Sequence, residues 1–327
     1  MSLAAEALAK AQNAYPGIRV PLTENGDSTR NHDALQDALA RAEARRLPVF
    51  LPPGKFAIDP ATIEVWDGFQ MLGAGGAYTA GRETAYLTQL VNEDTSGAVA
   101  LTFVPPGTGK HWGQRIADFE VLGNADSGHG VKVGSTASGH FLGPFNVERV
   151  VSRGHGGSGF FSSGYCDQFK FDSCIARNNA EYGFGFYDES GPRLKAQVML
   201  LNCHGNFNNI GMYLAAQVPS FIALNCEFAS NSIGWEVSSV GSVSHAQFIG
   251  GHCERNSSYH AQVGTGSVGI VRVQGMNFMD NVTNGLSEAS IRVRTDVGRL
   301  HIEDCSFSMQ NANTAFVKEE GTPRIIF

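Results

Sequence analysis

The sequence predicts an all-β solenoid, in which one chain winds into stacked coils and its strands form parallel sheets. One observation is an internal repeat: LNCHGNFNNIG from residue 201 and LNCEFASNSIG from residue 224 share Leu, Asn, Cys, a later Asn, Ile and Gly at the same offsets. Another is that apolar residues alternate in short runs broken by Gly and Asn, which is typical of strands and turns. Strands that recur every ~25 residues without helices between them stack into coils around a continuous core.

The repeat extends through most of the chain when Cys226 is taken as position zero and Asn231 as position five. The same spacing, in two places without the Asn, recurs at Phe119/Asn124, Val150/His155, Cys174/Asn179, Cys203/Asn208, Gly251/Asn256, Met276/Asn281 and Cys305/Gln310. An Asn at a turn can hydrogen-bond to the Asn of the neighbouring coils, and Asn and Gly tolerate left-handed backbone. A β-sandwich, the alternative all-β fold, gives no reason for an Asn at this fixed offset. We therefore expect a stacked asparagine ladder.

Composition and charge exclude several classes of partner. The chain has 327 residues and a formal net charge of −7, whereas nucleic-acid binders are typically basic, so no nucleic-acid partner is expected. An acidic glycan stays compatible with this charge, because a local basic groove can exist on an acidic protein. No apolar run approaches the ~18 residues of a transmembrane helix, so no membrane contact is expected. The N-terminal MSLAAEALAKAQNAY has no basic region followed by a long apolar region, so no signal peptide is visible.

Neither disulfides nor a metal site is expected. Six cysteines lie at Cys166, Cys174, Cys203, Cys226, Cys253 and Cys305. They contain no CxxC pair, which argues against a zinc ribbon. Several lie inside the repeat beside apolar residues, which favours buried free thiols over disulfides. The histidines show no helical metal-binding spacing, so we expect no metal and no cofactor.

The N-terminal part of the chain has a different pattern, NGDSTRNHDALQDALARAEARRLPVFLPPGKFAID at residues 25–59 and GFQMLGAGG at residues 68–76. Leu35, Leu39, Ala42 and Leu47 supply the apolar face of a helix, which we expect at about residues 33–46. A strand and a Pro-Pro-Gly turn follow at 49–54, and a strand ending in a Gly-rich turn follows at 72–76.

This entry segment, with the Asn- and Gly-rich coils that follow it, resembles the pectate-lyase-like superfamily of right-handed parallel β-helix proteins. That superfamily includes pectate lyases, polygalacturonases, uronan epimerases and phage tailspikes. The resemblance implies a single-stranded right-handed parallel β-helix over residues 25–327, after an N-terminal segment 1–24, with a short N-terminal capping α-helix. One departure is NGDSTRNHDALQ, where relatives more often have Gly-Asp-Gly and then an Asp-rich turn.

The resemblance also implies partners and a location. It implies a polysaccharide substrate and an extracellular or virion-associated protein. Tailspike-like relatives are typically trimers, so the resemblance implies a homotrimer. A calcium ion would be compatible with such a protein, although nothing in the sequence indicates one.

Outward positions one and three residues after zero form two surface rows, with neighbouring coils ~4.8 Å apart. The first row is Glu120, Val151, Ile175, His204, Glu227, His252, Asn277 and Ser306. The second row is Leu122, Arg153, Arg177, Asn206, Ala229, Glu254, Met279 and Ser308. His204, Glu227 and His252 should therefore stack in adjacent coils. Glu254 flanks this cluster, and Arg177 lies farther off.

The two imidazoles and two carboxylates of this cluster suit acid–base chemistry on a sugar chain. In a hydrolase, Glu227 and Glu254 would be acid and base, with Cα atoms about 8 Å apart, which is compatible with an inverting enzyme. A Glu between two charged histidines has a lowered pKa, however, which suits a base better than an acid. In a lyase or epimerase, His204 or His252 would take the C5 proton of a uronic acid, and Arg177 would offset the substrate carboxylate. The alternative is a solvated strand face with modest cross-strand pairs.

Further substrate-binding candidates are Asn206 in the second row, Arg255 at the edge of this face, and Asp188 in a polar loop at 187–193. Lys170 and Asp172 are expected to form a surface ion pair. The sequence thus predicts a carbohydrate-active enzyme, either a polysaccharide lyase or a glycoside hydrolase of the tailspike depolymerase type, working in a groove on the solenoid face. The alternatives are a non-catalytic glycan-binding or structural spike, and a scaffold built for trimer contacts.

Overall fold

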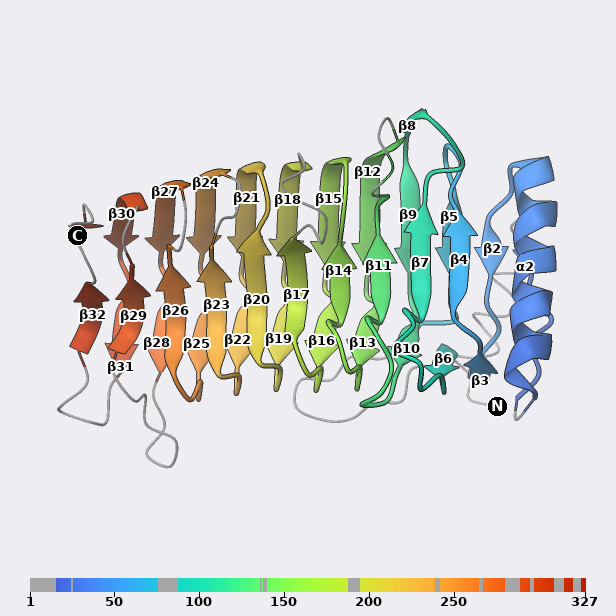
Figure 1. Cartoon of the computed structure of the whole chain (residues 1–327), viewed down its shortest axis with the longest axis horizontal. Coiled ribbons are helices and arrows are strands. Elements are labelled where there is room, and N and C mark those ends of the chain that lie inside the picture. Colours follow the sequence, from blue (N-terminus) through green and yellow to red (C-terminus); the bar gives the residue numbers. More distant parts are fainter. Residues whose placement is uncertain are drawn as a thin grey trace.

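The structure of the protein is a computed structural model. It describes residues 16–24, 26–75, 88–135, 137, 140–187, 195–238, 242–264, 267–279, 289–294, 297–308, 315–319 and 325–327. The chain forms an elongated solenoid, with the single described helix, α2, at one end and the coils stacked along the long axis (Figure 1). A typical coil takes one strand from each of three sheets, as in β18, β19 and β20, and every pairing between described strands is parallel.

The three sheets run along the length of the solenoid. In the described residues the first sheet contains β1 (Ile18–Arg19), β2 (Val49–Phe50), β5 (Gln70–Leu72), β9 (Gln114–Ala117), β12 (His140–Glu148), β15 (Cys166–Asp172), β18 (Lys195–Leu201), β21 (Val218–Leu224), β24 (Ser242–Ile249), β27 (Ser267–Gln274), β30 (Val297–Glu303) and β33 (Ile325–Ile326), with β8 (Gly109–His111) beside β12.

The second sheet contains β3 (Gly54–Ile58), β6 (Thr88–Asn92), β10 (Glu120–Leu122), β13 (Val151–Arg153), β16 (Ile175–Arg177), β19 (His204–Asn206), β22 (Glu227–Ala229), β25 (His252–Glu254), β28 (Asn277–Met279) and β31 (Ser306–Ser308). The third contains β4 (Ala61–Glu64), β7 (Leu101–Val104), β11 (Val131–Val133), β14 (Phe160–Ser162), β17 (Tyr182–Tyr187), β20 (Ile210–Ala215), β23 (Ile233–Val237), β26 (Tyr259–Val263), β29 (Ala289–Val293) and β32 (Ala315–Glu319).

The core fills the inside of the coils. In the coil from β21 to β23, the inward side chains are Phe221, Ala223, Phe228, Trp235 and Val237, all at most 2% exposed. They alternate with outward side chains because successive residues of a strand face opposite sides of the sheet. Full burial of a large apolar side chain contributes about 1.5–3 kcal/mol, so the stacked coils are held together mainly by this continuous core.

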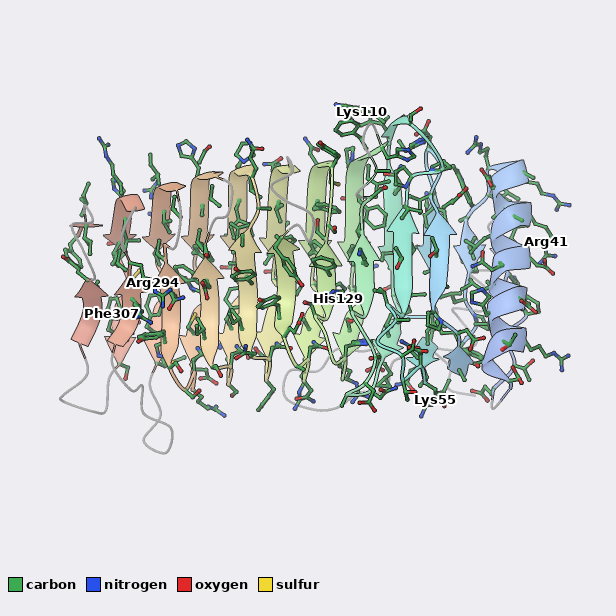
Figure 2. The ribbon with its side chains drawn as sticks, viewed as in Figure 1. Arg41, Lys55, Lys110, His129, Arg294 and Phe307 are labelled. Carbon is green, nitrogen blue, oxygen red and sulfur yellow. The ribbon has the colours of Figure 1, made fainter. Side chains whose placement is uncertain are left out.

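The helix α2 (Ser28–Arg45) covers the open end of the first coil and contacts β1, β2, β3 and β4. It buries Leu35, Leu39 and Ala42, while Arg41 extends away from the coils (Figure 2). The helix begins five residues earlier than expected, because the Asp27 carboxylate accepts hydrogen bonds from the N–H groups at positions 29 and 30. The strand β1, which falls in the segment predicted to precede the solenoid, pairs with β2 and so extends the first sheet.

The predicted asparagine ladder lies at the corner between the second and third sheets. The Asn179 side-chain amide donates to Oδ1 of Asn208 at 2.9 Å, and the backbone N–H of Asn208 donates to Oδ1 of Asn231 at 2.8 Å. The backbone N–H of Asn231 donates in turn to Asn256 at 3.0 Å, and all four side chains are buried. The ladder thus satisfies buried backbone groups that a corner would otherwise leave without partners.

Left-handed backbone occurs one residue before the ladder position rather than on it. Asn178, Phe207, Ser230 and Arg255 have φ between 54° and 57°. The ladder asparagines are therefore selected by their hydrogen bonds, and the residue before each of them makes the turn. For Phe207 this conformation is costly, because a bulky residue is rarely found with positive φ.

The cysteines are free thiols, as the sequence predicts. Five are buried and Cys305 is partly exposed. Burial raises the pKa of the Cys203 thiol, and its stacked neighbours Cys174 and Cys226 raise it further. These thiols therefore act as small apolar core residues. Among the described residues, no helix is long and apolar enough to cross a membrane.

Candidate functional site

The predicted surface rows exist on the outer face of the second sheet. Parallel pairing places His204 of β19 opposite Glu227 of β22, and Glu227 opposite His252 of β25. In the second row, Arg177 of β16 lies opposite Asn206 of β19. The register follows from the inward alternation of the core residues, so the outward side chains meet without any long loop to place them.

One carboxylate oxygen joins the two imidazoles. Oε2 of Glu227 lies 3.0 Å from Nδ1 of His204 and 3.4 Å from Nε2 of His252. The second oxygen, Oε1, accepts a hydrogen bond at 2.7 Å from the side-chain amide of Asn206. Asn206 is held in turn by the backbone N–H of Ala229, which donates to its Oδ1 at 3.1 Å. Both oxygens of the carboxylate are therefore fixed by neighbouring strands.

These contacts determine the charge of Glu227. The hydrogen bond with His204 lowers the pKa of the Glu227 carboxyl most, partial burial opposes this shift, and the charges of His204 and His252 and the Asn206 amide lower it further. The carboxylate is thus ionised at neutral pH and only accepts hydrogen bonds, so Nδ1 of His204 must carry the hydrogen that faces it. The cluster stays accessible, because 23% of the Glu227 side chain and 33% of the His252 side chain are exposed.

Arg177 is held by an aromatic ring beside the cluster. Its guanidinium lies 4.9 Å from the centroid of the Phe207 ring, and its Nε is buried without a hydrogen-bond partner among the described residues. The Phe207 side chain is 48% exposed although its backbone is left-handed. Strained backbone that persists next to polar side chains is often a feature of functional sites. We therefore add Phe207 to the candidate site.

The remaining predicted residues have other surroundings. Glu254 forms an ion pair with Arg255, with Nη2 of Arg255 2.9 Å from Oε1 of Glu254. Asp188 lies outside the described residues. Lys170 and Asp172 form the predicted surface ion pair at 3.1 Å, on the first sheet. Farther along the first row, Glu120 is 3% exposed and pairs with Arg153, which makes it a structural ion pair.

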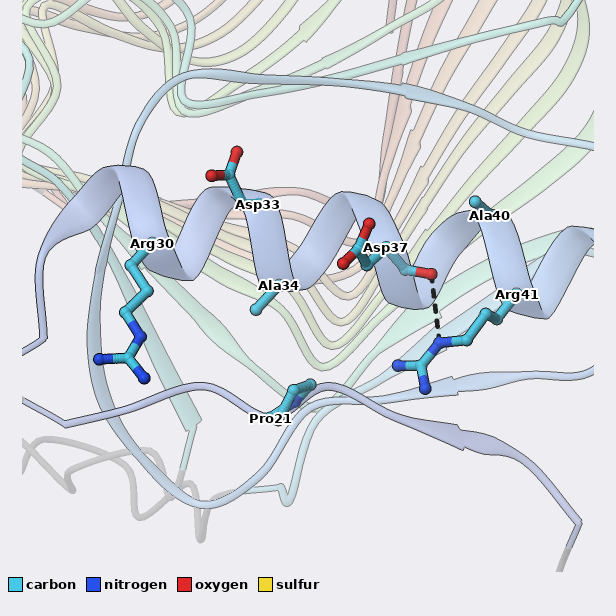
Figure 3. A pocket seen from close by; sticks show the side chains of 7 residues that line it. All are labelled: Pro21, Arg30, Asp33, Ala34, Asp37, Ala40 and Arg41. Atoms are coloured by element: carbon cyan, nitrogen blue, oxygen red, sulfur yellow. Dashed lines mark hydrogen bonds between the residues drawn. The ribbon is translucent and has the colours of Figure 1, made fainter.

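A separate hollow lies against the capping helix, away from the cluster (Figure 3). Its volume is about 720 Å³, and its lining residues are Pro21, Arg30, Asp33, Ala34, Asp37, Ala40 and Arg41. Nε of Arg41 donates to the backbone oxygen of Asp37 at 3.3 Å, within the helix itself. Charges of both signs on a solvated helix face are typical of a surface helix, so this hollow carries no specific chemistry. Within the described part of the chain, no group of three or more His, Cys, Asp or Glu side chains could hold a metal ion.

Comparison with known proteins relates the chain to solved structures only. No protein-family model matches the sequence, and no curated protein matches it. The A-module of the mannuronan C-5 epimerase AlgE6 of Azotobacter vinelandii has a TM-score of 0.57 at 15% identity, over 94% of this chain and 99% of that one. The ORF18 protein of Geobacillus virus E2 has a TM-score of 0.55 at 14% identity, over 92% of this chain and 64% of that one.

These likenesses, with three parallel sheets, decide the architecture. The chain is a right-handed parallel β-helix. The resemblance stated from the entry segment is confirmed for the fold. At these identities the likeness says nothing about activity, so the chemistry of the β-helix must be argued from its own side chains.

Sequence reasoning missed two features of this β-helix. The first is Phe207, and its signal in the sequence is a Phe at the left-handed position, where neighbouring coils have Asn178 and Ser230. The second is a group of titratable side chains on the third sheet, around Glu236, where the carboxyl alternates with two core residues. Its only signal was a charged residue within an otherwise apolar strand.

Proposed function

We propose that this β-helix protein is a polysaccharide lyase that acts on a chain containing uronic acid. The observation that carries the proposal is the Glu227 carboxylate, which contacts both His204 and His252 through one oxygen. An imidazole oriented by a carboxylate is a common proton carrier, because the carboxylate fixes the tautomer and stabilises the imidazolium that forms. Two such imidazoles beside one carboxylate provide both a proton acceptor and a proton donor.

The proposed base is His252, whose side chain is the more exposed of the two imidazoles. Its Nε2 faces Glu227, so its Nδ1 is the nitrogen that would take the C5 proton of the uronate. The electron pair of the broken C–H bond moves into the uronate carboxylate and then forms the C4–C5 double bond. The C4–oxygen bond breaks, and the departing glycosidic oxygen takes a proton from the imidazolium of His204.

The geometry favours elimination over epimerisation. His204 and His252 project from the same outer face of one sheet, so both would approach the sugar from the same side. Syn elimination needs the acid and the base on one side of the ring. Epimerisation at C5 needs removal of the proton from one side and its return from the other.

The same geometry disfavours a glycoside hydrolase. A hydrolase needs a carboxylic acid whose pKa is raised so that it can protonate the leaving group. The pKa of the Glu227 carboxyl is instead lowered by its hydrogen bond with His204. Glu254, the other carboxylate of the predicted pair, is held in an ion pair with Arg255.

Arg177 is the proposed partner of the uronate carboxylate. Removal of the C5 proton places additional charge on that carboxylate, so a nearby cation lowers the barrier. Arg177 lies opposite Asn206 in the coil before His204, and its position over the Phe207 ring holds its side chain toward this face. The guanidinium is suited to bidentate contact with a carboxylate.

The comparisons supply limited support. The epimerase A-module, by its name, acts on mannuronan, which is a uronic acid polymer, and this supports the proposed substrate class. The virus protein supports a virion-associated or extracellular location. A homotrimer stays a prediction from the resemblance.

The test is a panel of acidic and neutral polysaccharides incubated with the full chain. A lyase produces ultraviolet absorbance from the C4–C5 double bond together with new reducing ends. Reducing ends without this absorbance indicate a hydrolase, and tight binding without turnover indicates the rival function, a non-catalytic glycan-binding or structural spike. Either of the last two results rejects the proposed lyase.

A further inference from the structure

The third sheet carries a second set of polar side chains on its outer face. Parallel pairing aligns Tyr213 of β20, Glu236 of β23, Gln262 of β26 and Arg292 of β29 in one row across four coils. We call these four residues the third-sheet row. Trp235 and Val237, which flank Glu236 in the chain, are buried in the core. Because side chains alternate along a strand, Glu236 faces outward.

The middle of the third-sheet row is unusually buried for an outer face. Glu236 is 8% exposed and Gln262 is 4% exposed. This burial raises the pKa of the Glu236 carboxyl, while the hydrogen bond from Gln262 and the charges of Arg294 and Arg292 oppose the shift. Burying such polar groups costs free energy unless they are hydrogen-bonded.

Hydrogen bonds run along the third-sheet row in one direction. Nη1 of Arg292 donates to Oε1 of Gln262 at 3.5 Å, so the amide NH₂ of Gln262 is the group that donates to the Glu236 carboxyl. The Arg292 guanidinium also lies 5.1 Å from the centroid of the Tyr259 ring. Figure 2 shows Arg294 near these strands, on the face turned toward the viewer. Positive charge is therefore concentrated at this end of the row.

Tyrosine rings close the opposite end of the row. The rings of Tyr182 and Tyr213 are stacked, with centroids 4.5 Å apart and planes 16° apart, and Tyr187 lies edge-on to Tyr182 at 5.4 Å. The rings of Tyr182 and Tyr187 meet over Gly185, where an added Cβ would lie 3.2 Å from both rings. A larger residue at this position would have to push the two tyrosine rings outward by a few tenths of an ångström.

We propose that the third-sheet row is a second glycan site, which takes a segment of an acidic polysaccharide along the solenoid axis. In this site Arg292 binds an anionic substituent and the tyrosines form an aromatic wall at the other end, while the buried Gln262 and Glu236 hold Arg292 in place through their hydrogen bonds. An acidic sugar chain suits this combination, because a planar guanidinium binds a carboxylate through paired hydrogen bonds and aromatic rings pack against C–H groups. The choice of an acidic polysaccharide rests on the proposed function.

The two sites use the same coils on different faces. The strand pairs β19–β20, β22–β23 and β25–β26 carry His204 with Tyr213, Glu227 with Glu236, and His252 with Gln262, respectively. The buried asparagine ladder runs along the corner between them. The third-sheet row would therefore hold a polysaccharide independently of the chemistry at Glu227, as an anchoring site.

The test is calorimetric titration of the full chain with a size-defined oligomannuronate, and with a neutral cello-oligosaccharide of the same length. Glu227→Gln is the parent variant, so that turnover during the titration is slow. We expect two oligomannuronates per chain. Gln262→Ala and Arg292→Gln should each weaken one of the two sites about tenfold. Gln247→Ala and Arg272→Gln are matched controls, because these residues occupy the corresponding positions on the first sheet, and they should change affinity less than about twofold.

The outcomes separate this site from the proposed function. One oligomannuronate per chain, with no effect of Gln262→Ala or Arg292→Gln, overturns the second site even if the wild type is a lyase. Full lyase activity in Glu227→Gln rejects the proposed catalytic role while the second site stands. No binding of oligomannuronate, or equal binding of the neutral oligosaccharide, also overturns the proposal. If Gln262→Ala fails to fold by circular dichroism, the result for the more exposed Arg292 decides.

Discussion

Oε2 of Glu227 lies 3.0 Å from Nδ1 of His204, across two paired strands of one sheet. Because parallel pairing fixes the register, this contact does not depend on a loop that must first close. Preorganised side chains of this kind are what proton transfer requires, since little reorganisation is needed when the charge moves. The contact also makes Glu227 the residue whose loss should affect both imidazoles.

We expect Glu227→Gln to lower the rate of formation of unsaturated product by about 10²–10⁴-fold. The amide keeps the shape of the side chain but no longer stabilises an imidazolium or fixes both ring tautomers. Initial rates on an acidic polysaccharide measure the effect. Glu303→Gln is the control, because it removes a carboxylate that pairs with Arg272 on the first sheet. A rate within about twofold of the wild type would remove Glu227 from the mechanism.

Phe207→Asn should separate stability from function. Asn adopts left-handed backbone at the same position in the preceding coil, at Asn178, so the free energy of unfolding should change by less than about 1 kcal/mol or rise. The variant loses the ring beneath Arg177, so KM should increase several-fold while the fold is kept. Urea unfolding and substrate kinetics measure the two effects. A large loss of stability with unchanged KM would show that Phe207 has only a structural role.

Acid should destabilise the protein through two buried histidines. Burial lowers the pKa of His155 and of His260 to about 4, whereas an unfolded histidine titrates near 6.5. Between these values the unfolded chain binds protons that the folded chain does not, so stability is full above about pH 6.5 and is lost as the pH falls toward 4. Each histidine accounts for about 3 kcal/mol of this loss.

Urea midpoints measured from pH 7 to pH 4 test this pH dependence. His155→Asn should flatten the profile, because Asn occupies the same ladder position in other coils and does not titrate. Gln247→Asn, which changes a side chain of β24 that does not titrate, is the control and should leave the slope nearly unchanged. An identical slope in His155→Asn and the wild type would mean that His155 is not protonated on unfolding.

Asn231→Ala should cost about 3 kcal/mol of stability. The Asn231 side chain donates to the backbone oxygen of Gly205 at 2.8 Å, and its Oδ1 accepts the backbone N–H of Asn208, so removal leaves both buried groups without these partners. Asn225→Gly is the control, because Asn225 has left-handed backbone, which glycine adopts readily. Chemical denaturation of the two variants gives the comparison, and equal midpoints would contradict a stabilising role for the ladder.

Much of the fold could be predicted, because apolar and polar residues alternate within each strand and this alternation recurs at a regular spacing along the chain. Once Cys226 is placed in the core, the outward positions of Glu227 and its strand neighbours follow from alternation alone. The apolar pattern predicts the helix start about five residues too late, because the N-cap role of Asp27 depends on a local hydrogen bond that this pattern does not report.

The candidate site could be predicted only in part from the sequence. The row that contains His204 and Glu227 could be aligned, because it lies within strands. The contact of Arg177 with the Phe207 ring and the position of the Tyr182 ring over Gly185 could not be predicted. These contacts lie near corners, where strand alternation does not determine the direction of a side chain. The polysaccharide and its cleavage depend on affinity and chemistry that no spacing encodes, so they stay predictions.

The shared use of coils by the two proposed sites has an evolutionary consequence. Each coil contacts mainly its neighbours, so whole coils can be duplicated, lost or exchanged without refolding the remainder. A change of this kind between β18 and β27 would alter the residues near Glu227 and near Glu236 in one event. The two proposed activities, cleavage and anchoring, would then be inherited together, and replacing a few coils could adapt both to a different glycan.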